Sequence, residues 1–298
     1  MNTAAKLAVF AAAIAVTFGG AMAVGSAVGP IDVSGGGSSH SAHSADAPAG
    51  DFPRGLAVAQ DGYRFVPEAG PLGGGILAAE TATTFAFRIV DTDAAPITDF
   101  EQLHERPLHL IVLSRNLVDY LHLHPTMDAA GRWTVDLPAL APGSYRMYAD
   151  FQPSGGDNLT LGTDFAVPGN VAATALPEPS TSESVDGYTV TLAGTPMVGE
   201  AALTFTVDLD GSTVHTDPYL GAAGHLVAIR AGDLAYLHVH PNSTPTDVAE
   251  TFLGEFPSAG TYRLFFDFSH NGTVHTAAFT VEVPEGTAAT AMTDSEGH

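Results

Sequence analysis

Two sets of histidines with the same spacing are the residues of this chain best suited to chemistry. They are His109, His122 and His124 in the first set, and His225, His238 and His240 in the second. In each set, a short apolar segment follows the first histidine, and a proline follows the third. Neutral imidazole nitrogens are ligands that Zn²⁺ and Cu²⁺ favour. Each set therefore predicts a metal site with three nitrogen ligands.

The spacing suits two adjacent strands of one sheet. A hairpin centred between Arg115 and Asn116 would place His109 directly opposite His122. Opposed residues share one face of a sheet, with Cβ atoms about 4.5–5.5 Å apart. His124 follows two positions later and so shares that face. The second set allows the same arrangement, so we expect three imidazoles on one face in each case.

Two aspartates could supply a further ligand. Asp150 and Asp267 recur in the two halves of the chain, on what we predict to be the next strand. Arg146 and Arg263 recur beside them, so the alternative is an ion pair or hydrogen bond between each aspartate and its arginine. A water molecule in the open position is a third arrangement.

The chain contains no cysteine, which limits the kinds of metal site that it can build. Zinc sites with cysteine ligands and the His₂Cys sites of blue-copper proteins are excluded. The alternative to metal binding is a structural cluster of histidines. Three close imidazoles without metal would resist joint protonation and make the domain sensitive to acid.

Strands must position these histidines, because the dominant hydrophobic period of the chain is two. Segments 83–89, 203–209 and 262–268 alternate apolar with other side chains, and turn signals such as Asn271-Gly272 separate such runs. This pattern is typical of short β-strands joined by tight turns. We find no segment with the periodicity of an amphipathic helix in this part of the chain.

The strand pattern occurs in two similar units of about 100 residues, the size of a small domain. The motif Gly-Ser-Tyr145-Arg, for example, recurs as Gly-Thr-Tyr262-Arg. We therefore predict an all-β fold of two tandem β-sandwich domains, immunoglobulin-like or cupredoxin-like, over 57–169 and 186–284.

The amino-terminal segment differs from the rest of the chain. Lys6 precedes an apolar segment, 7–31, that contains no charged residue. Segment 1–31 is predicted to be a signal peptide or a membrane anchor, with Lys6 on the cytoplasmic side. The protein would then be secreted, or would lie in the cell membrane as a single-pass protein with its domains outside. The other predicted segments are a flexible Gly/Ser/His linker (32–56), an inter-domain linker (170–185) and a disordered tail (285–298).

The charge of the chain excludes some partners. Thirty-three acidic residues against 10 basic ones give a net charge of −23. Such a surface repels nucleic acid and anionic lipid headgroups. We therefore expect no nucleic-acid partner, and contact with a membrane only through the amino-terminal segment.

The histidine motifs also carry a resemblance to a known group of proteins. Segments 108–112, 120–125 and 143–146 resemble those of tandem His-Leu-His-Pro β-sandwich proteins, secreted or membrane-anchored, from high-GC Gram-positive bacteria. The resemblance covers about 60–285 and implies a heavy-metal-associated role. The chain departs from extracytoplasmic copper carriers because it lacks a Met-rich segment and an N-terminal histidine ligand. The resemblance therefore does not decide between copper and zinc.

The function predicted from the sequence is non-enzymatic binding of Cu²⁺ or Zn²⁺ outside the cytoplasm, with one three-histidine site in each domain. Buffering, delivery or resistance would be its purpose, and a membrane metal transporter or a surface protein its partner. The alternative is a structural or adhesive cell-surface module without metal. A zinc-dependent hydrolase or lyase is less favoured, because no glutamate adjoins the histidines to act as general base.

Overall fold

The computed structural model describes residues 53–68, 81–172, 174–237, 239–241 and 249–285. The predicted segment 1–31, nearly all of linker 32–56 and nearly all of tail 285–298 lie outside these residues. The described part of the chain contains no helix that is long and apolar enough to cross a membrane.

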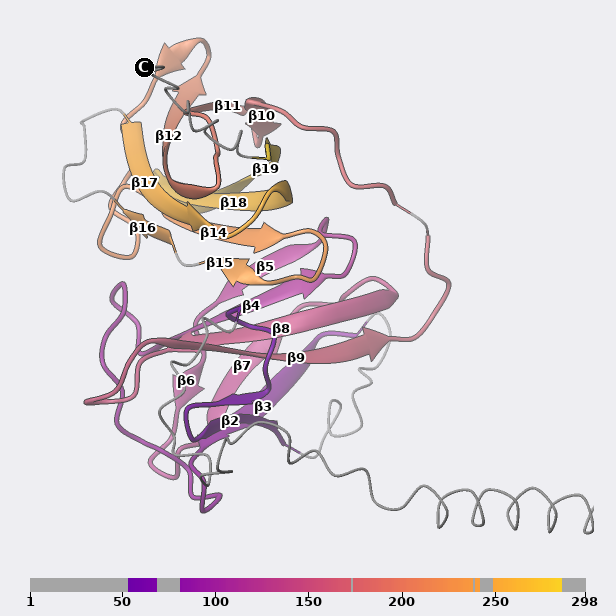
Figure 1. The fold of residues 1–298 in the computed structure, drawn as a ribbon, viewed down its shortest axis with the longest axis vertical. Coiled ribbons are helices and arrows are strands. Elements are labelled where there is room, and N and C mark those ends of the chain that lie inside the picture. Colours follow the sequence, from indigo (N-terminus) through magenta and orange to yellow (C-terminus); the bar gives the residue numbers. More distant parts are fainter. Residues whose placement is uncertain (1–52, 69–80, 173, 238, 242–248, 286–298) are drawn as a thin grey trace, which may run out of the picture. The chain divides into compact units, whose positions relative to one another are not determined.

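The first sandwich consists of two antiparallel sheets (Figure 1). One has the strand order β1-β2-β3-β7-β6 and the other β5-β4-β8-β9. The strands are β1 (Ala59–Gln60), β2 (Tyr63–Pro67), β3 (Thr83–Val90), β4 (Leu108–Ser114), β5 (Tyr120–Leu123), β6 (Thr126–Met127), β7 (Trp133–Leu137), β8 (Gly143–Phe151) and β9 (Leu159–Val167).

The second sandwich repeats this plan. One sheet has the order β10-β11-β12-β17-β16, with β13 paired to β12, and the other has the order β15-β14-β18-β19. The strands are β10 (Ser182–Val185), β11 (Tyr188–Ala193), β12 (Gly199–Leu209), β13 (Ser212–Thr213), β14 (His225–Arg230), β15 (Tyr236–Leu237), β16 (Val239–Pro241), β17 (Ala249–Phe256), β18 (Gly260–His270) and β19 (Thr273–Val283). The predicted all-β fold of two tandem sandwiches is confirmed.

The alternating segments form strands with one face in a core, as their period requires. In β3, Phe85, Phe87 and Ile89 are buried in the core between the two sheets of the first sandwich. Strand β4 differs, because all seven of its residues are buried. Leu110 and Val112 on one face join the core of the first sandwich. The opposite face of β4 must therefore be covered by something else.

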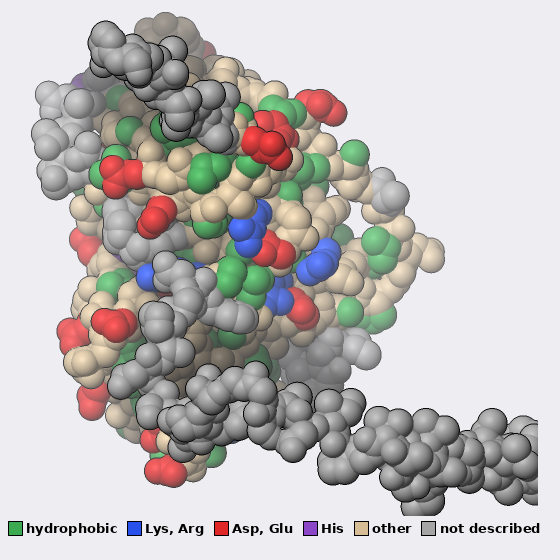
Figure 2. Space-filling model, viewed as in Figure 1, with side chains coloured by type: hydrophobic (Ala, Val, Ile, Leu, Met, Phe, Trp, Pro, Cys, Tyr) green, Lys and Arg blue, Asp and Glu red, His purple; other side chains and the backbone are tan. Residues whose placement is uncertain are grey.

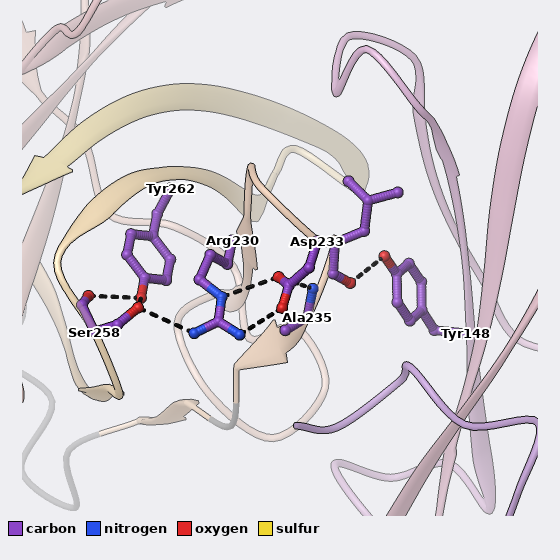
Figure 3. Close-up of polar contacts among 7 residues, drawn as sticks. Tyr148, Arg230, Asp233, Ala235, Ser258 and Tyr262 are labelled. Atoms are coloured by element: carbon purple, nitrogen blue, oxygen red, sulfur yellow. Dashed lines mark hydrogen bonds and ion pairs between the residues drawn. The ribbon is translucent and has the colours of Figure 1, made fainter. Parts of the chain in front are cut away.

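The second sandwich covers that face. Nine buried residues from both sandwiches form one apolar cluster, here called the seam: Ile111, Leu113, Leu117, Tyr148, Val227, Ile229, Leu234, Tyr236 and Phe265. The ring of Tyr120 stacks on that of Phe265, with centroids 4.1 Å apart and planes 4° from parallel. The Tyr148 hydroxyl donates a hydrogen bond to the Leu234 carbonyl at 2.8 Å (Figure 3). Both sandwiches belong to one compact unit, Pro53–His298.

The seam uses equivalent positions of the two repeats. Ile111 and Leu113 on β4 correspond to Val227 and Ile229 on β14, and all four lie in the seam. Two copies of one surface that bury each other form an isologous contact, the arrangement found in twofold-symmetric dimers. Here the contact joins two halves of a single chain.

The hairpin between β4 and β5 has a different register from the one expected. Ile111, not His109, lies opposite His122. The prediction of direct opposition is wrong by two positions, because the turn is centred one residue later than expected. The Ser114 amide bonds to the Asp119 carbonyl at 2.9 Å, and the Ser114 hydroxyl accepts the Asp119 amide at 2.8 Å.

The hairpin between β14 and β15 shows the same shift. Ala228 lies opposite Leu237, two positions from the expected register. Leu234 in this turn and Leu117 in the turn of the first hairpin both have positive φ, 65° and 63°. A shift of two residues preserves which face each side chain occupies. The expectation that His109, His122 and His124 share a face therefore survives the error in register.

After the second hairpin strand, the chain changes sheets. β15 pairs with β14, whereas β16 pairs with β17 in the opposite sheet, where His240 lies opposite Leu253. The expectation that His240 continues on the strand beside His225 is therefore wrong. In the first sandwich, β5 and β6 are divided between the two sheets in the same way.

Acidic side chains are spread over the face of the molecule drawn in Figure 2, whereas Lys and Arg gather near mid-height. A scattered arrangement of like charge keeps a protein soluble without creating a single strong cation site. The acidic composition alone therefore does not locate a metal site.

Candidate metal centre

Four histidines and one aspartate converge where the two sandwiches meet. His109, His122 and His124 each place one ligand atom within 4.8 Å of the others, and so do His122, His225 and Asp267. These five residues are called the histidine cluster below. Three of them come from the first sandwich and two from the second. The sequence predicted the first triad as a set, but it assigned His225 to a separate site in the second domain.

Strand register explains how both sandwiches supply residues to the histidine cluster. His109 is the first residue of β4 on the seam face, two residues before Ile111. His225 occupies the equivalent position on β14, two residues before Val227. Asp267 lies directly opposite His225 on β18. The isologous contact of the seam therefore brings the histidine ends of both sheets together.

Hydrogen bonds determine which nitrogen of two of the rings carries a proton. His109 Nε2 lies 2.9 Å from the Leu103 carbonyl oxygen, which only accepts hydrogen bonds. His122 Nδ1 lies 2.8 Å from Asp267 Oδ2, which as a carboxylate oxygen also accepts. Both nitrogens must therefore carry protons. In the neutral rings, His109 Nδ1 and His122 Nε2 are left with lone pairs.

These two lone pairs face each other. His109 Nδ1 and His122 Nε2 are 2.9 Å apart, and two unprotonated nitrogens at that distance repel. A cation removes the repulsion, either as a proton on one of the rings or as a metal ion bound by both. Metal–nitrogen distances of about 2.0–2.1 Å allow one ion to reach both atoms.

Two further nitrogens of the cluster have no protein partner. His124 Nε2 and His225 Nδ1 are buried and form no hydrogen bond within the described part of the chain. The ring centroids of His124 and His225 lie 4.8 Å and 4.6 Å from that of His122. Buried polar atoms without a partner are rare and point to a missing ligand, water or ion.

Asp267 is held by the cluster and not by its neighbouring arginine. Its carboxylate accepts hydrogen bonds from His122 Nδ1 at 2.8 Å, the Tyr120 hydroxyl at 3.2 Å and the Thr276 hydroxyl at 2.6 Å. Arg263 bonds instead to the carbonyls of Leu117 and Ala278 and to Thr280. The predicted alternative of an Asp267–Arg263 pair is wrong.

The first repeat shows the same correction. Arg146 pairs with Asp164 at 2.7 Å and donates to the carbonyls of Gly55 and Leu56. Asp150 accepts hydrogen bonds from Asn158 and Thr160, and burial raises its pKa above the usual value. Asp150 lies opposite His109 on β8, but it is not a member of either ligand group among the described residues.

The other two histidines of the second set, His238 and His240, are not among the residues of the described cluster. His238 lies outside the described residues, and the side chain of His240 does too. Sequence reasoning passed over His104, which has no counterpart in the second half. Its ring centroid lies 5.3 Å from that of His225 and 6.0 Å from that of His109. The repeat pattern gave no signal for it, because only shared positions stand out in a comparison of repeats.

Burial favours the neutral form of three of the histidines, His109, His124 and His225, when no metal is bound. Burial, then the neighbouring His122, lowers the pKa of His109 from 6.5 to about 2. The same causes lower the pKa of His124 to about 3. Burial also holds the pKa of His225 well below its usual value. Neutral imidazoles are the form in which histidine binds metal ions.

These lowered pKa values predict that the metal-free protein loses stability in acid. Unfolded histidines take up protons near pH 6.5, whereas His109 and His124 in the folded protein do so only near pH 2 and 3. The unfolded state therefore binds more protons below pH 6.5, and the free energy of unfolding falls as pH falls. For a group as buried as His109, the slope is at most about 1.4 kcal/mol per pH unit.

Urea unfolding of the metal-free protein between pH 7.5 and 5 would measure this slope. His109→Gln, which cannot titrate, should reduce it, while His215→Ala, on an exposed residue, should not. A stability that is flat across this pH range in the wild type would show that the histidines are not buried as neutral groups.

Comparisons with known proteins were informative at the level of family. The family model described as "Domain of unknown function (DUF8832)" matches the chain twice, over residues 59–169 and 183–285. These matches coincide with the two sandwiches. No match was found among curated proteins.

Several solved structures have a similar all-β arrangement. Domains 4–9 of the surface layer protein SbsC are 14% identical, with a TM-score of 0.23, over 75% of this chain and 31% of that one. Yersinia pseudotuberculosis InvD is 15% identical (TM-score 0.24), over 78% of this chain and 61% of that one. The fibronectin(III)-like modules of Clostridium thermocellum CbhA are 10% identical (TM-score 0.22), over 74% and 92%. Scores and identities this low carry no information about function.

Proposed function

The chain belongs to the DUF8832 family, as a tandem pair of its domains, and from this premise we propose that the pair binds one Zn²⁺ or Cu²⁺ ion between its two sandwiches. The ligands are His109, His122 and His124 from the first sandwich and His225 from the second. The observation that carries the proposal is the 2.9 Å approach of His109 Nδ1 to His122 Nε2, two nitrogens whose rings are protonated on the other side.

The partners of the ligands support this assignment. Histidines that bind metals usually donate their second ring N–H to a carboxylate or a carbonyl, which orients the ring. His122 has such a partner in Asp267, and His109 has one in the Leu103 carbonyl. The unpartnered nitrogens of His124 and His225 supply the remaining ligands.

The role proposed for the ion is capture and not catalysis. Asp267 is the carboxylate of the cluster, and it already accepts three hydrogen bonds. It is therefore poorly placed to serve as a general base for a bound water. Buffering, delivery or resistance outside the cytoplasm fits such a site, with a membrane metal transporter or a surface protein as the partner that supplies or receives the ion. The apolar segment 7–31 supports this location.

The proposal can be tested by metal content and by fluorescence. Trp133 is the only tryptophan of the chain, and it lines the same pocket as His124. Binding of Cu²⁺, a strong quencher, should therefore quench the fluorescence of Trp133 and saturate at about one ion per chain. The stripped and reloaded protein should retain about one ion after desalting. No retained metal and no saturable quenching would contradict the proposal.

A second candidate, a structural or adhesive surface module without metal, is favoured by the seam. Nine buried residues hold the two sandwiches together without any ion, as a rigid spacer requires. In that case a proton shared within the cluster would relieve the repulsion between His109 and His122. The same metal analysis separates the two candidates, because the structural module retains no ion.

A further inference from the structure

A pocket of about 440 Å³ opens beside the histidine cluster. His124 forms part of its wall, with Phe100, Gln102, Arg106, Met127 and Trp133. Because His124 belongs to both, the pocket adjoins the histidine cluster. It is called the His124 pocket below.

Two side chains of the His124 pocket, those of Trp133 and Arg106, can only donate hydrogen bonds. Trp133 is fully buried, and its indole N–H has no hydrogen-bond partner among the described residues. Arg106 is exposed and forms no ion pair with any described residue. An indole N–H and a guanidinium only donate. The ligand that suits them is an acceptor, and Arg106 favours one with negative charge.

The charge of the loaded cluster gives a second reason for an anion. Four neutral imidazoles and the carboxylate of Asp267 would offset only one of the two charges of Zn²⁺ or Cu²⁺. The side chains of His122 and Asp267 are only 4% and 1% exposed, so solvent screens the remaining charge poorly. An uncompensated charge in such surroundings is costly. One monoanion beside the ion would remove the imbalance.

We propose that the His124 pocket binds a small planar oxyanion of single negative charge, which completes the coordination of the metal ion. One oxygen binds the metal, and the others accept hydrogen bonds from Arg106 and Trp133. Hydrogen carbonate and short carboxylates share this chemistry. The inference rests on the proposed function, because it requires the metal ion.

Binding of the anion can be measured through its effect on the affinity of the protein for the metal ion. If the anion binds only beside the ion, it must strengthen metal binding by the same factor by which the metal strengthens anion binding. We expect acetate or hydrogen carbonate at millimolar concentration to tighten Zn²⁺ binding about tenfold, equivalent to about 1.4 kcal/mol. The measurement is competition with a chromophoric chelator in buffer free of carboxylates and carbon dioxide, with chloride as the spherical control anion.

Separate titrations distinguish the two sources of the oxyanion. Acetate and hydrogen carbonate are added singly to the Zn²⁺-loaded protein, and Trp133 fluorescence reports occupancy of the pocket. A response to either supports the proposal, and the tighter one identifies the preferred ligand. A response to chloride of equal size would indicate only ionic strength and would overturn the proposal.

Matched variants locate the effect. Arg106→Gln should abolish the anion effect while about one Zn²⁺ per chain still binds. Arg115→Gln, an exposed arginine on the β4–β5 turn, should keep the full effect. Zinc binding without any anion effect would overturn this inference alone, whereas a wild type that retains no zinc would overturn both it and the proposed function.

Discussion

Replacing His122 with alanine is expected to abolish stable metal binding. His122 is the central ring of the cluster, with its Nε2 2.9 Å from His109 and its Nδ1 2.8 Å from Asp267. Four-ligand zinc sites contribute about 10–16 kcal/mol, so one ligand accounts for about 3 kcal/mol, or on the order of a hundredfold in affinity. The loss should exceed this value, because Asp267 also loses one of its three hydrogen-bond partners. Zinc affinity by chelator competition measures the effect.

Two controls separate lost ligands from lost folding. His215→Ala removes an exposed histidine outside the cluster and should leave metal affinity unchanged. Asp267→Asn keeps a hydrogen-bonding group next to His122 and should weaken binding by about 10–100-fold, the usual effect of altering a ligand's partner. Unchanged zinc affinity in a folded His122→Ala protein would show that the metal, if bound, lies elsewhere.

Replacing Phe265 with alanine is expected to destabilise the protein by about 3–5 kcal/mol. Phe265 is fully buried in the seam, and its ring stacks on that of Tyr120. Its loss leaves a cavity between the two sandwiches, so we also expect weaker coupling between them. Urea unfolding followed by circular dichroism should change from one transition towards two.

Phe279→Ala is the matched control. Phe279 is also fully buried, but it lies in the core of the second sandwich. This variant should destabilise the second sandwich by a similar amount without altering the seam, so metal binding by the remaining folded protein should be retained. If Phe265→Ala lowers stability no more than an exposed substitution does, the seam does not hold the sandwiches together in solution.

Local properties of the fold followed from the sequence. The period of two placed Phe85, Phe87 and Ile89 on the buried face of one strand. The same rule placed His109, His122 and His124 on one face, although the hairpin register was wrong by two positions. Face depends only on whether a position is odd or even along the strand, so an error of two positions leaves it intact.

The non-local part of the cluster could not be predicted. The spacing of His225 matches that of His109, which suggested a separate site in each domain. In the structure, the seam faces of the two sandwiches meet, and His225 joins the ligands of the first half. Docking of two surfaces leaves no periodicity in the sequence. The available signal in the sequence was the apolar run 110–113, which does not alternate and which the structure shows to be buried on both faces.

The alternative pairing of Asp267 with Arg263 was wrong for a related reason. Arg263 lies four residues away on the same strand, so proximity in sequence favoured a pair. Two residues four positions apart on one strand point to the same face of the sheet, but they lie about 13 Å apart along it. The His122 ring, 145 residues away in sequence, is the closer partner at 2.8 Å.

The isologous contact of the seam has a consequence for assembly. In a dimer of separate chains, formation of the interface depends on protein concentration, and both copies must carry the same residues. A covalent link replaces that dependence with a fixed effective concentration, typically in the millimolar range for short flexible linkers. It also frees the two halves to diverge, as His104 in the first half alone illustrates. A fused pair can thus hold an ion bound by three histidines of one half and one of the other, even when the protein is very dilute. A dimer of separate single domains would dissociate at that dilution and release its ion.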